Sequence, residues 1–91
     1  MPRLMVPAQL RDLTGGEREL ELDGGTVGEV LHALVTRYPK VKDRIFDEEG
    51  AIEPTIAIAV DGEVERHYPN FKVGPDSELS IIPAIGGGSG R

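Results

Sequence analysis

The sequence contains no cysteine among its 91 residues. Disulfides, zinc sites with thiolate ligands and a cysteine nucleophile are therefore excluded. A persulfide on a side chain is excluded for the same reason, so any sulfur on this chain would have to be held elsewhere. The absence of tryptophan and the 4% share of aromatic residues indicate a core of leucine, isoleucine and valine.

Long apolar runs and an excess of positive charge are also absent. No segment approaches the ~20 apolar residues needed to span a bilayer, and residues 1–7 are too short and too interrupted by proline for a signal peptide. The formal net charge is -6, which disfavours nucleic acid as a partner. We expect a cytoplasmic protein that binds neither membranes nor nucleic acid. The acidic surface favours a protein partner with a basic patch, although solubility alone would account for it.

The length of the chain allows one small domain. We expect this domain to comprise residues 1–85, followed by a flexible glycine-rich tail over residues 86–91. A domain of this size has little space for a deep substrate cleft, which argues against an enzyme that acts on its own.

One helix stands out in the pattern of apolar residues. Thr26 and Glu29 have capping-box spacing, and the apolar residues that follow have the i, i+3, i+4 spacing of one helical face. Pro39 ends the pattern. We therefore predict a helix over residues 27–38 whose apolar face comprises Val27, Val30, Leu31, Leu34, Val35 and Tyr38.

Alternating apolar residues and turn signals predict strands on either side of this helix. Residues 3–6 and 17–22 are expected to form a hairpin, with residues 8–16 as the loop between its strands. The remaining predicted elements are a short helix over 40–46, an acidic loop over 47–50, a strand over 56–60, a type I′ turn at Asp61-Gly62, a short strand over 63–65 and a last strand over 78–82. The element order is β-β-α-β-β-β, with one helix covering one face of a small mixed sheet.

Four features could suggest chemistry but have simpler structural interpretations. Residues 24–28 (GGTVG) lie where phosphate-binding loops occur, yet they fit neither nucleotide-binding pattern and no lysine follows. His32 and His67 are the two histidines, and without cysteine or an i, i+4 pair they give little support for a metal site. The acidic residues 47–49 are typical of a solvated loop, and Ser89 has no nearby histidine as a base. We predict no catalytic residue and no metal site.

The most informative segment is residues 80–91, SIIPAIGGGSGR. A strand-like apolar run ends at Pro83 and continues into glycines, which lack a Cβ and let another molecule approach the main chain closely. Such a tail fits a narrow channel, and the working part of the protein would then be its own C-terminal backbone. Chain ends are also commonly disordered without any function, and the tail alone does not decide between these interpretations.

The chain resembles the ubiquitin-like sulfur carriers of the β-grasp fold over nearly its whole length. The resemblance rests on Thr14-Gly15-Gly16, the helix over 26–38, the Val60-Asp61-Gly62 turn and, most specifically, DSELSIIPAI at residues 76–85. Members include the small subunit of molybdopterin synthase and the carriers for thiazole and cysteine synthesis, of which the cysteine type is the most similar. The resemblance implies an α+β, β-grasp fold with a mixed sheet of four to five strands and one main helix.

The resemblance also implies a reaction at the C-terminus. The family's Gly-Gly corresponds to Gly87 and Gly88. An E1-like enzyme would use ATP to adenylate the carboxylate of Gly88, which would become a thiocarboxylate, and a sulfur-accepting biosynthetic enzyme would take the sulfur. Gly86 and Gly87 would give slim access to both active sites. The stem that docks on the activating enzyme would comprise Pro83, Ala84 and Ile85. The chain would bind no cofactor and would be a carrier rather than an enzyme.

Ser89-Gly90-Arg91 depart from the family pattern, because an internal Gly88 has no free carboxylate. These residues are either artificial or a native extension that a protease removes. The retained Met1 favours the extension, and the resemblance implies a JAMM-type metalloprotease. Two alternatives to a sulfur carrier stay open: a protein modifier joined through Gly88 to lysines of its targets, and a β-grasp interaction module without tail chemistry.

Overall fold

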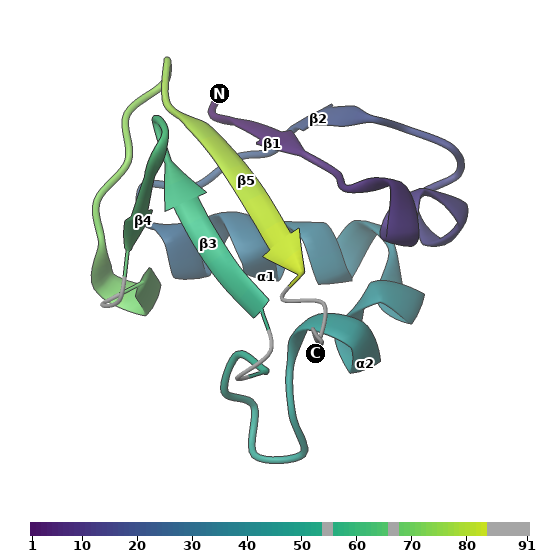
Figure 1. Cartoon of the computed structure of the whole chain (residues 1–91). Helices are drawn as coiled ribbons and strands as arrows, with labels where there is room; N and C mark the ends of the chain where they lie inside the picture. Colours follow the sequence, from purple (N-terminus) through teal and green to yellow (C-terminus); the bar gives the residue numbers. More distant parts are fainter. Residues whose placement is uncertain (54–55, 66–67, 84–91) are drawn as a thin grey trace, which may run out of the picture.

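The computed structural model describes residues 1–53, 56–65 and 68–83. Five strands form one mixed sheet in the order β2-β1-β5-β3-β4, in which β1 and β5 are parallel and the other pairs are antiparallel (Figure 1). The strands are β1 (Arg3–Met5), β2 (Glu19–Glu21), β3 (Ile56–Val60), β4 (Glu63–Glu65) and β5 (Glu78–Pro83). The helices are α1 (Val27–Arg37), α2 (Lys42–Ile45) and the 3-10 turns η1 (Ala8–Leu13), η2 (Pro39–Val41) and η3 (Tyr68–Asn70). The α+β architecture predicted from the sequence is confirmed.

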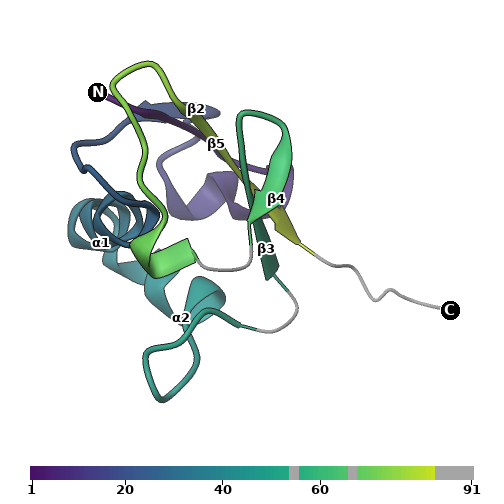
Figure 2. The ribbon, with the colours of Figure 1, turned by 90° about the vertical axis from the view of Figure 1, so that its left-hand side faces the viewer.

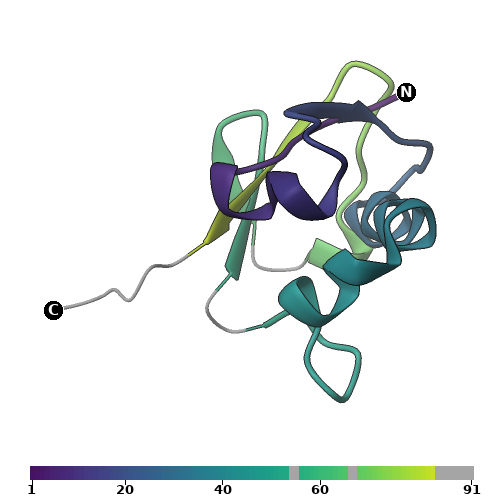
Figure 3. The same ribbon diagram turned by 90° about the vertical axis from the view of Figure 1, so that its right-hand side faces the viewer.

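The sheet forms one layer and α1 and α2 form the other (Figures 2 and 3). One row of paired residues crosses four strands of the inner sheet face: Leu20, Leu4, Leu79 and Val60. All four are buried, and they belong to one apolar cluster with the inward-facing residues of α1. The fold therefore depends on side chains that alternate in the strands and recur every three or four residues in the helix.

The first turn of α1 forms the capping box that the sequence predicts. The amide of Glu29 donates to Oγ1 of Thr26 at 3.2 Å, and the amide of Gly25 donates to Oε1 of Glu29 at 2.7 Å. Four of the predicted face residues (Val27, Val30, Leu31 and Leu34) are buried, and Val35 and Tyr38 are half-buried. The helix ends at Arg37, one residue before the predicted end, with Tyr38 as its C-cap.

The predicted type I′ turn between β3 and β4 is confirmed by its backbone angles. Asp61 has φ 51° and Gly62 has φ 90°, the two left-handed positions that this turn requires. The predicted last strand extends by one residue to Pro83, and the predicted helix over 40–46 is present as η2 followed by α2.

Residues 8–16, predicted to be a loop, contain a 3-10 helix over Ala8–Leu13. Leu10 is buried and Leu13 packs against the core cluster, so burial of these two side chains fixes the segment. A segment of this length contains too few apolar residues to show a helical period, which is why the pattern did not reveal it. The short turn η3 was likewise not predicted.

Candidate functional site

The strand that leads to the glycine tail lies in the middle of the sheet. β5 pairs with β1 on one side and β3 on the other, and the β3 pairing runs from Val60 opposite Leu79 to Ile56 opposite Pro83. Leu79 and Ile81 are buried in the core. Hydrogen bonds on both sides and buried side chains on one face hold β5 in place up to Pro83, the last described residue.

Most of the residues that the sequence assigned to the tail chemistry lie outside the described residues. These are Ala84, Ile85, Gly86, Gly87, Gly88 and Ser89. Of the predicted docking stem, Pro83 is described, and it is the last residue of β5, opposite Ile56. The roles assigned to these residues stay predictions.

An apolar surface lies on the outer side of the sheet at the end of β5. Alternation places Ile82 on the face opposite the buried Ile81. Ile82 pairs with Ala57, and the neighbouring row runs through Glu19, Met5, Ser80, Ala59 and Val64. Ile82 is 41% exposed and Val64 is 55% exposed. We call the five apolar residues (Met5, Ala57, Ala59, Val64 and Ile82) the outer apolar patch. Ile82 and Val64 are its exposed members, Met5 and Ala57 are half-buried and Ala59 is buried. Exposed apolar side chains that lie together on a small protein are typical of contact surfaces.

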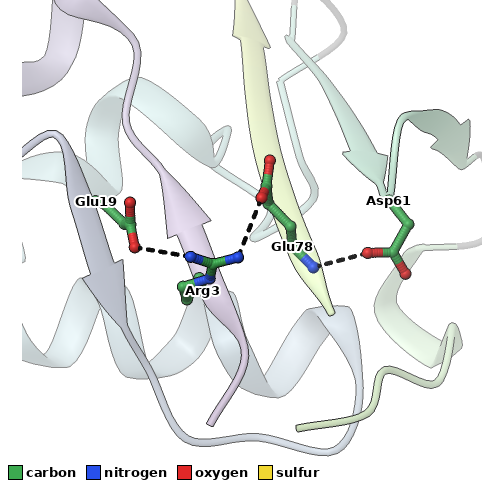
Figure 4. Close-up of polar contacts among 4 residues, drawn as sticks. All are labelled: Arg3, Glu19, Asp61 and Glu78. Carbon is green, nitrogen blue, oxygen red and sulfur yellow. Dashed lines mark hydrogen bonds and ion pairs between the residues drawn. The ribbon is translucent and has the colours of Figure 1, made fainter. Parts of the chain in front are cut away.

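The other end of the same face is charged. Arg3 on β1 forms ion pairs with Glu19 on β2, at 3.3 Å, and with Glu78 on β5, at 3.4 Å (Figure 4). The amide of Glu78 donates to Oδ1 of Asp61 at 2.9 Å. All three ion-pair side chains are exposed, so the pairs contribute little to stability. The outer face therefore carries Arg3 and Glu78 where β5 begins and Ile82 where β5 ends, and the row between them contains Glu19 and Ser80 as well as apolar residues.

The GGTVG segment has the structural role that the sequence indicated. A Cβ at Gly24 would lie 2.8 Å from the amide nitrogen of Val30, and a Cβ at Gly28 would lie 2.8 Å from the carbonyl oxygen of Pro69. The amide of Gly25 is already bonded to the carboxylate of Glu29. Gly24 and Gly28 are thus required for close packing, and the amide just before the helix is bonded to a carboxylate of the same chain.

The other candidate chemical groups are dispersed. His32 is exposed on α1, and His67 lies outside the described residues. Oδ1 of Asp47 accepts from the amides of Glu49 and Ala51, at 2.9 and 3.0 Å, which accounts for its position in the acidic loop. Across residues 1–53, 56–65 and 68–83, no group of three His, Asp or Glu side chains could hold a metal ion. Within the same ranges, the helices are too short to cross a bilayer.

A family model described as the ThiS family matches residues 4–88. The chain belongs to the ThiS family. This ThiS-family chain is 28% identical over 87 residues to the sulfur carrier protein CysO of Mycobacterium tuberculosis, covering 91% of this chain and 94% of the relative. It is 30% identical over 83 residues to small archaeal modifier protein 1 of Haloferax volcanii, with 89% and 93% covered.

Solved structures agree with this membership. A chain in the crystal structure of the Amycolatopsis orientalis BexX/CysO complex superposes with a TM-score of 0.87 at 31% identity, covering 97% of this chain and all of that one. The resemblance to the ubiquitin-like sulfur carriers is confirmed, and so is the β-grasp fold of this ThiS-family member.

The outer apolar patch is the part of the candidate site that the sequence did not reveal. Two signals for it were present. Ile81 and Ile82 are consecutive apolar residues in a strand, so one of them must face away from the core. Val64 stands between Glu63 and Glu65 in an edge strand. Neither signal shows that the two residues share one surface, because that depends on the order of the strands.

Proposed function

We propose that this protein is a sulfur carrier whose reactive group is the C-terminal carboxylate of Gly88, exposed after removal of Ser89 to Arg91. The sulfur would go to cysteine, molybdopterin or thiazole biosynthesis, with the cysteine type favoured by the Thr-Gly-Gly turn and the Ile-Pro-Ala sequence. The chain acts as the substrate or small subunit of partner enzymes and not as an enzyme itself.

The observation that carries this proposal is the extent of the family match, which runs to residue 88 and thus includes the glycines after β5. A chain without cysteine needs a main-chain group to hold sulfur, which agrees with this assignment. The relatives named as sulfur carriers are similar along more than nine-tenths of their length, so the comparison concerns the whole domain and not the tail alone.

The chemistry proceeds in two steps. A carboxylate oxygen of Gly88 attacks the α-phosphorus of ATP on an E1-like enzyme, giving an acyl adenylate and releasing pyrophosphate. A sulfur nucleophile at the oxidation level of sulfide then attacks the acyl carbon. AMP leaves with the electron pair of the broken C–O bond. The product is a thiocarboxylate, which a sulfur-accepting enzyme consumes. ATP belongs to the activating enzyme, and the carrier binds no cofactor of its own.

Two features of the described structure support this proposal. The central strand β5 fixes the origin of the tail, and the outer apolar patch lies beside that origin. We propose that the patch, together with the stem Pro83, Ala84 and Ile85, docks on the activating enzyme. Gly86 and Gly87 then pass through the narrow entrance to its active site, where a Cβ on either residue would clash with the walls of the entrance.

The test uses two versions of the chain, the full chain and a chain ending at Gly88. Each is incubated with ATP, the cognate E1-like enzyme and sulfide, and its mass is measured. The shortened chain should gain the mass of one oxygen-to-sulfur exchange, and the full chain should gain it only after a JAMM-type protease has acted. A shortened Gly88→Ala variant carries a Cβ on its terminal residue, and it tests whether the reaction requires glycine at that position. A shortened wild-type chain that never shows the exchange would refute the proposal.

A second function is favoured by the match to small archaeal modifier protein 1, at 30% identity. The same activated Gly88 could be joined to lysine side chains of target proteins. Isopeptide-linked adducts in cell extracts would identify this function, and the thiocarboxylate mass identifies the first. An interaction module without tail chemistry would keep its function after deletion of every residue beyond Ala84.

A further inference from the structure

A cavity of about 510 Å³ opens on the helical side of the molecule. Its walls come from α1, α2, the loop after α2 and η3, which converge in the lower part of Figure 2. Leu31 and Val35 on α1, Phe46 after α2, and Ile52 supply its large apolar side chains. The volume falls in the range of roughly 300–1,000 Å³ that is typical of binding pockets.

The walls of this cavity are held by specific contacts. Phe46 and Ile52 form a β-bridge across the loop, and the amide of Asp47 donates to the carbonyl of Ala51 at 2.7 Å. On the other wall, Gly28 lies so close to Pro69 that a Cβ would meet its carbonyl oxygen at 2.8 Å. Glycine and alanine at the edge (Gly28, Gly50 and Ala51) leave the space open. The cavity is thus part of the folded structure.

The ionisable side chains that line the cavity are not acidic, although the loop that forms one wall contains Asp47, Glu48 and Glu49, which are not among the lining residues. Among the described residues that line it, His32 and Lys42 have ionisable side chains, and neither is a carboxylate. Both are exposed. Lys42 is the one lysine or arginine among the lining residues of the described chain. Lysine donates to carboxylates as a cation, and histidine has an N–H donor in either protonation state.

We propose that this cavity is a second docking site, which binds a segment of a partner protein containing a large apolar side chain flanked by Asp or Glu. The apolar side chain fills the space over Leu31, Phe46 and Ile52, and the flanking carboxylates interact with Lys42 and His32. Lys42 and His32 lie exposed beside an apolar space, so the carboxylates that they bind would be on residues flanking the apolar side chain, and a peptide segment supplies both groups. The inference does not depend on the tail chemistry.

The test compares two pools of short peptides with blocked ends, measured by backbone amide shifts of the full isotope-labelled chain. Both pools have an apolar central pair, and the flanking positions are Asp and Glu in one pool and Lys and Arg in the other. The acidic pool should shift the amides of His32, Lys42 and Ala51, and the basic pool should not. Octanoate, which has one apolar chain and one carboxylate, is measured in the same way as a small-molecule comparison.

Two variants connect the binding to the cavity. Lys42→Glu should weaken binding of the acidic pool at least about fivefold, since it reverses one exposed charge. Ala51→Trp places a large side chain at the edge of the cavity and should weaken binding about tenfold or more. Arg18→Glu and Ala8→Trp make the same changes at exposed positions that do not line the cavity, and they should bind as the wild type does.

Preference for the acidic pool, lost in both cavity variants and kept in both controls, would support the proposal. Equal binding of the two pools, no binding of either, or binding of octanoate without the acidic peptides would overturn it. Amide spectra of each variant show whether it is folded. Because the unactivated full chain is used, the outcome is separate from that of the thiocarboxylate experiment.

Discussion

Asp61 and Glu78 hold the β3–β4 turn against the start of β5 through two reciprocal hydrogen bonds. The amide of Asp61 donates to the carbonyl of Glu78 at 2.8 Å, and the amide of Glu78 donates to Oδ1 of Asp61 at 2.9 Å. Asp61 also has a left-handed backbone, with φ 51°. The side chain of Asp61 therefore accepts from the first amide of β5, and its backbone amide donates to the same residue.

Replacing Asp61 separates these contributions. Asp61→Ala loses the acceptor and puts a Cβ-bearing residue without side-chain hydrogen bonds in a left-handed conformation, so the free energy of unfolding should fall by about 1–3 kcal/mol. Asp61→Asn keeps an acceptor and tolerates this conformation, and should cost less than about 1 kcal/mol. Denaturant unfolding followed by circular dichroism measures both. Equal losses in the two variants would contradict the assigned role of Oδ1.

Gly28→Ala tests the close contact between α1 and η3. Alanine normally stabilises a helix interior by about 1 kcal/mol relative to glycine, but here its Cβ would lie 2.8 Å from a backbone oxygen of Pro69. Because a backbone atom cannot move aside cheaply, we expect a net loss of about 1–2 kcal/mol. Gly74→Ala, where nothing lies within 4 Å of the added Cβ, should change stability by less than about 0.5 kcal/mol. A more stable Gly28→Ala protein in thermal unfolding would show that the contact relaxes.

Arg3 and Leu4 are neighbours that contribute very differently to stability. Arg3→Ala removes two exposed ion pairs and should lower the free energy of unfolding by no more than about 1 kcal/mol. Leu4→Ala empties a fully buried position in the sheet core and should lower it by about 2–5 kcal/mol. Urea unfolding of both variants checks the order, and an Arg3→Ala loss as large as that of Leu4→Ala would be inconsistent with the exposed geometry.

Ile82→Asp tests the outer apolar patch. Ile82 is 41% exposed, so the change should cost about 1 kcal/mol or less in stability. If the patch docks on the activating enzyme, kcat/KM for ATP–pyrophosphate exchange should fall about tenfold or more, because an anchor at the centre of an interface is lost. Gln9→Asp introduces the same charge at an exposed site on η1 and should leave the exchange unchanged. A similar effect of both variants would exclude a specific role for the patch.

Local sequence patterns specify the individual elements of this protein and limit its chemistry. The capping pair Thr26 and Glu29, the periodic apolar face and Pro39 define α1, because capping and helical periodicity involve residues only a few positions apart. Asp61-Gly62 defines the turn for the same reason. The absence of cysteine and the run of glycines after Ile85 indicate the main chain of the tail as the place where sulfur could be held.

The surfaces of the molecule, in contrast, depend on how the elements pack together. The outer apolar patch requires Ile82 and Val64 to share a face, which follows from β3 lying between β4 and β5. The cavity on the helical side requires Gly28, Lys42 and Ile52 to converge from separate elements. The buried 3-10 turn with Leu10 depends likewise on the core that receives it. The physical reason is that strand order and packing between layers bring together residues far apart in the chain, and no local pattern encodes those distances.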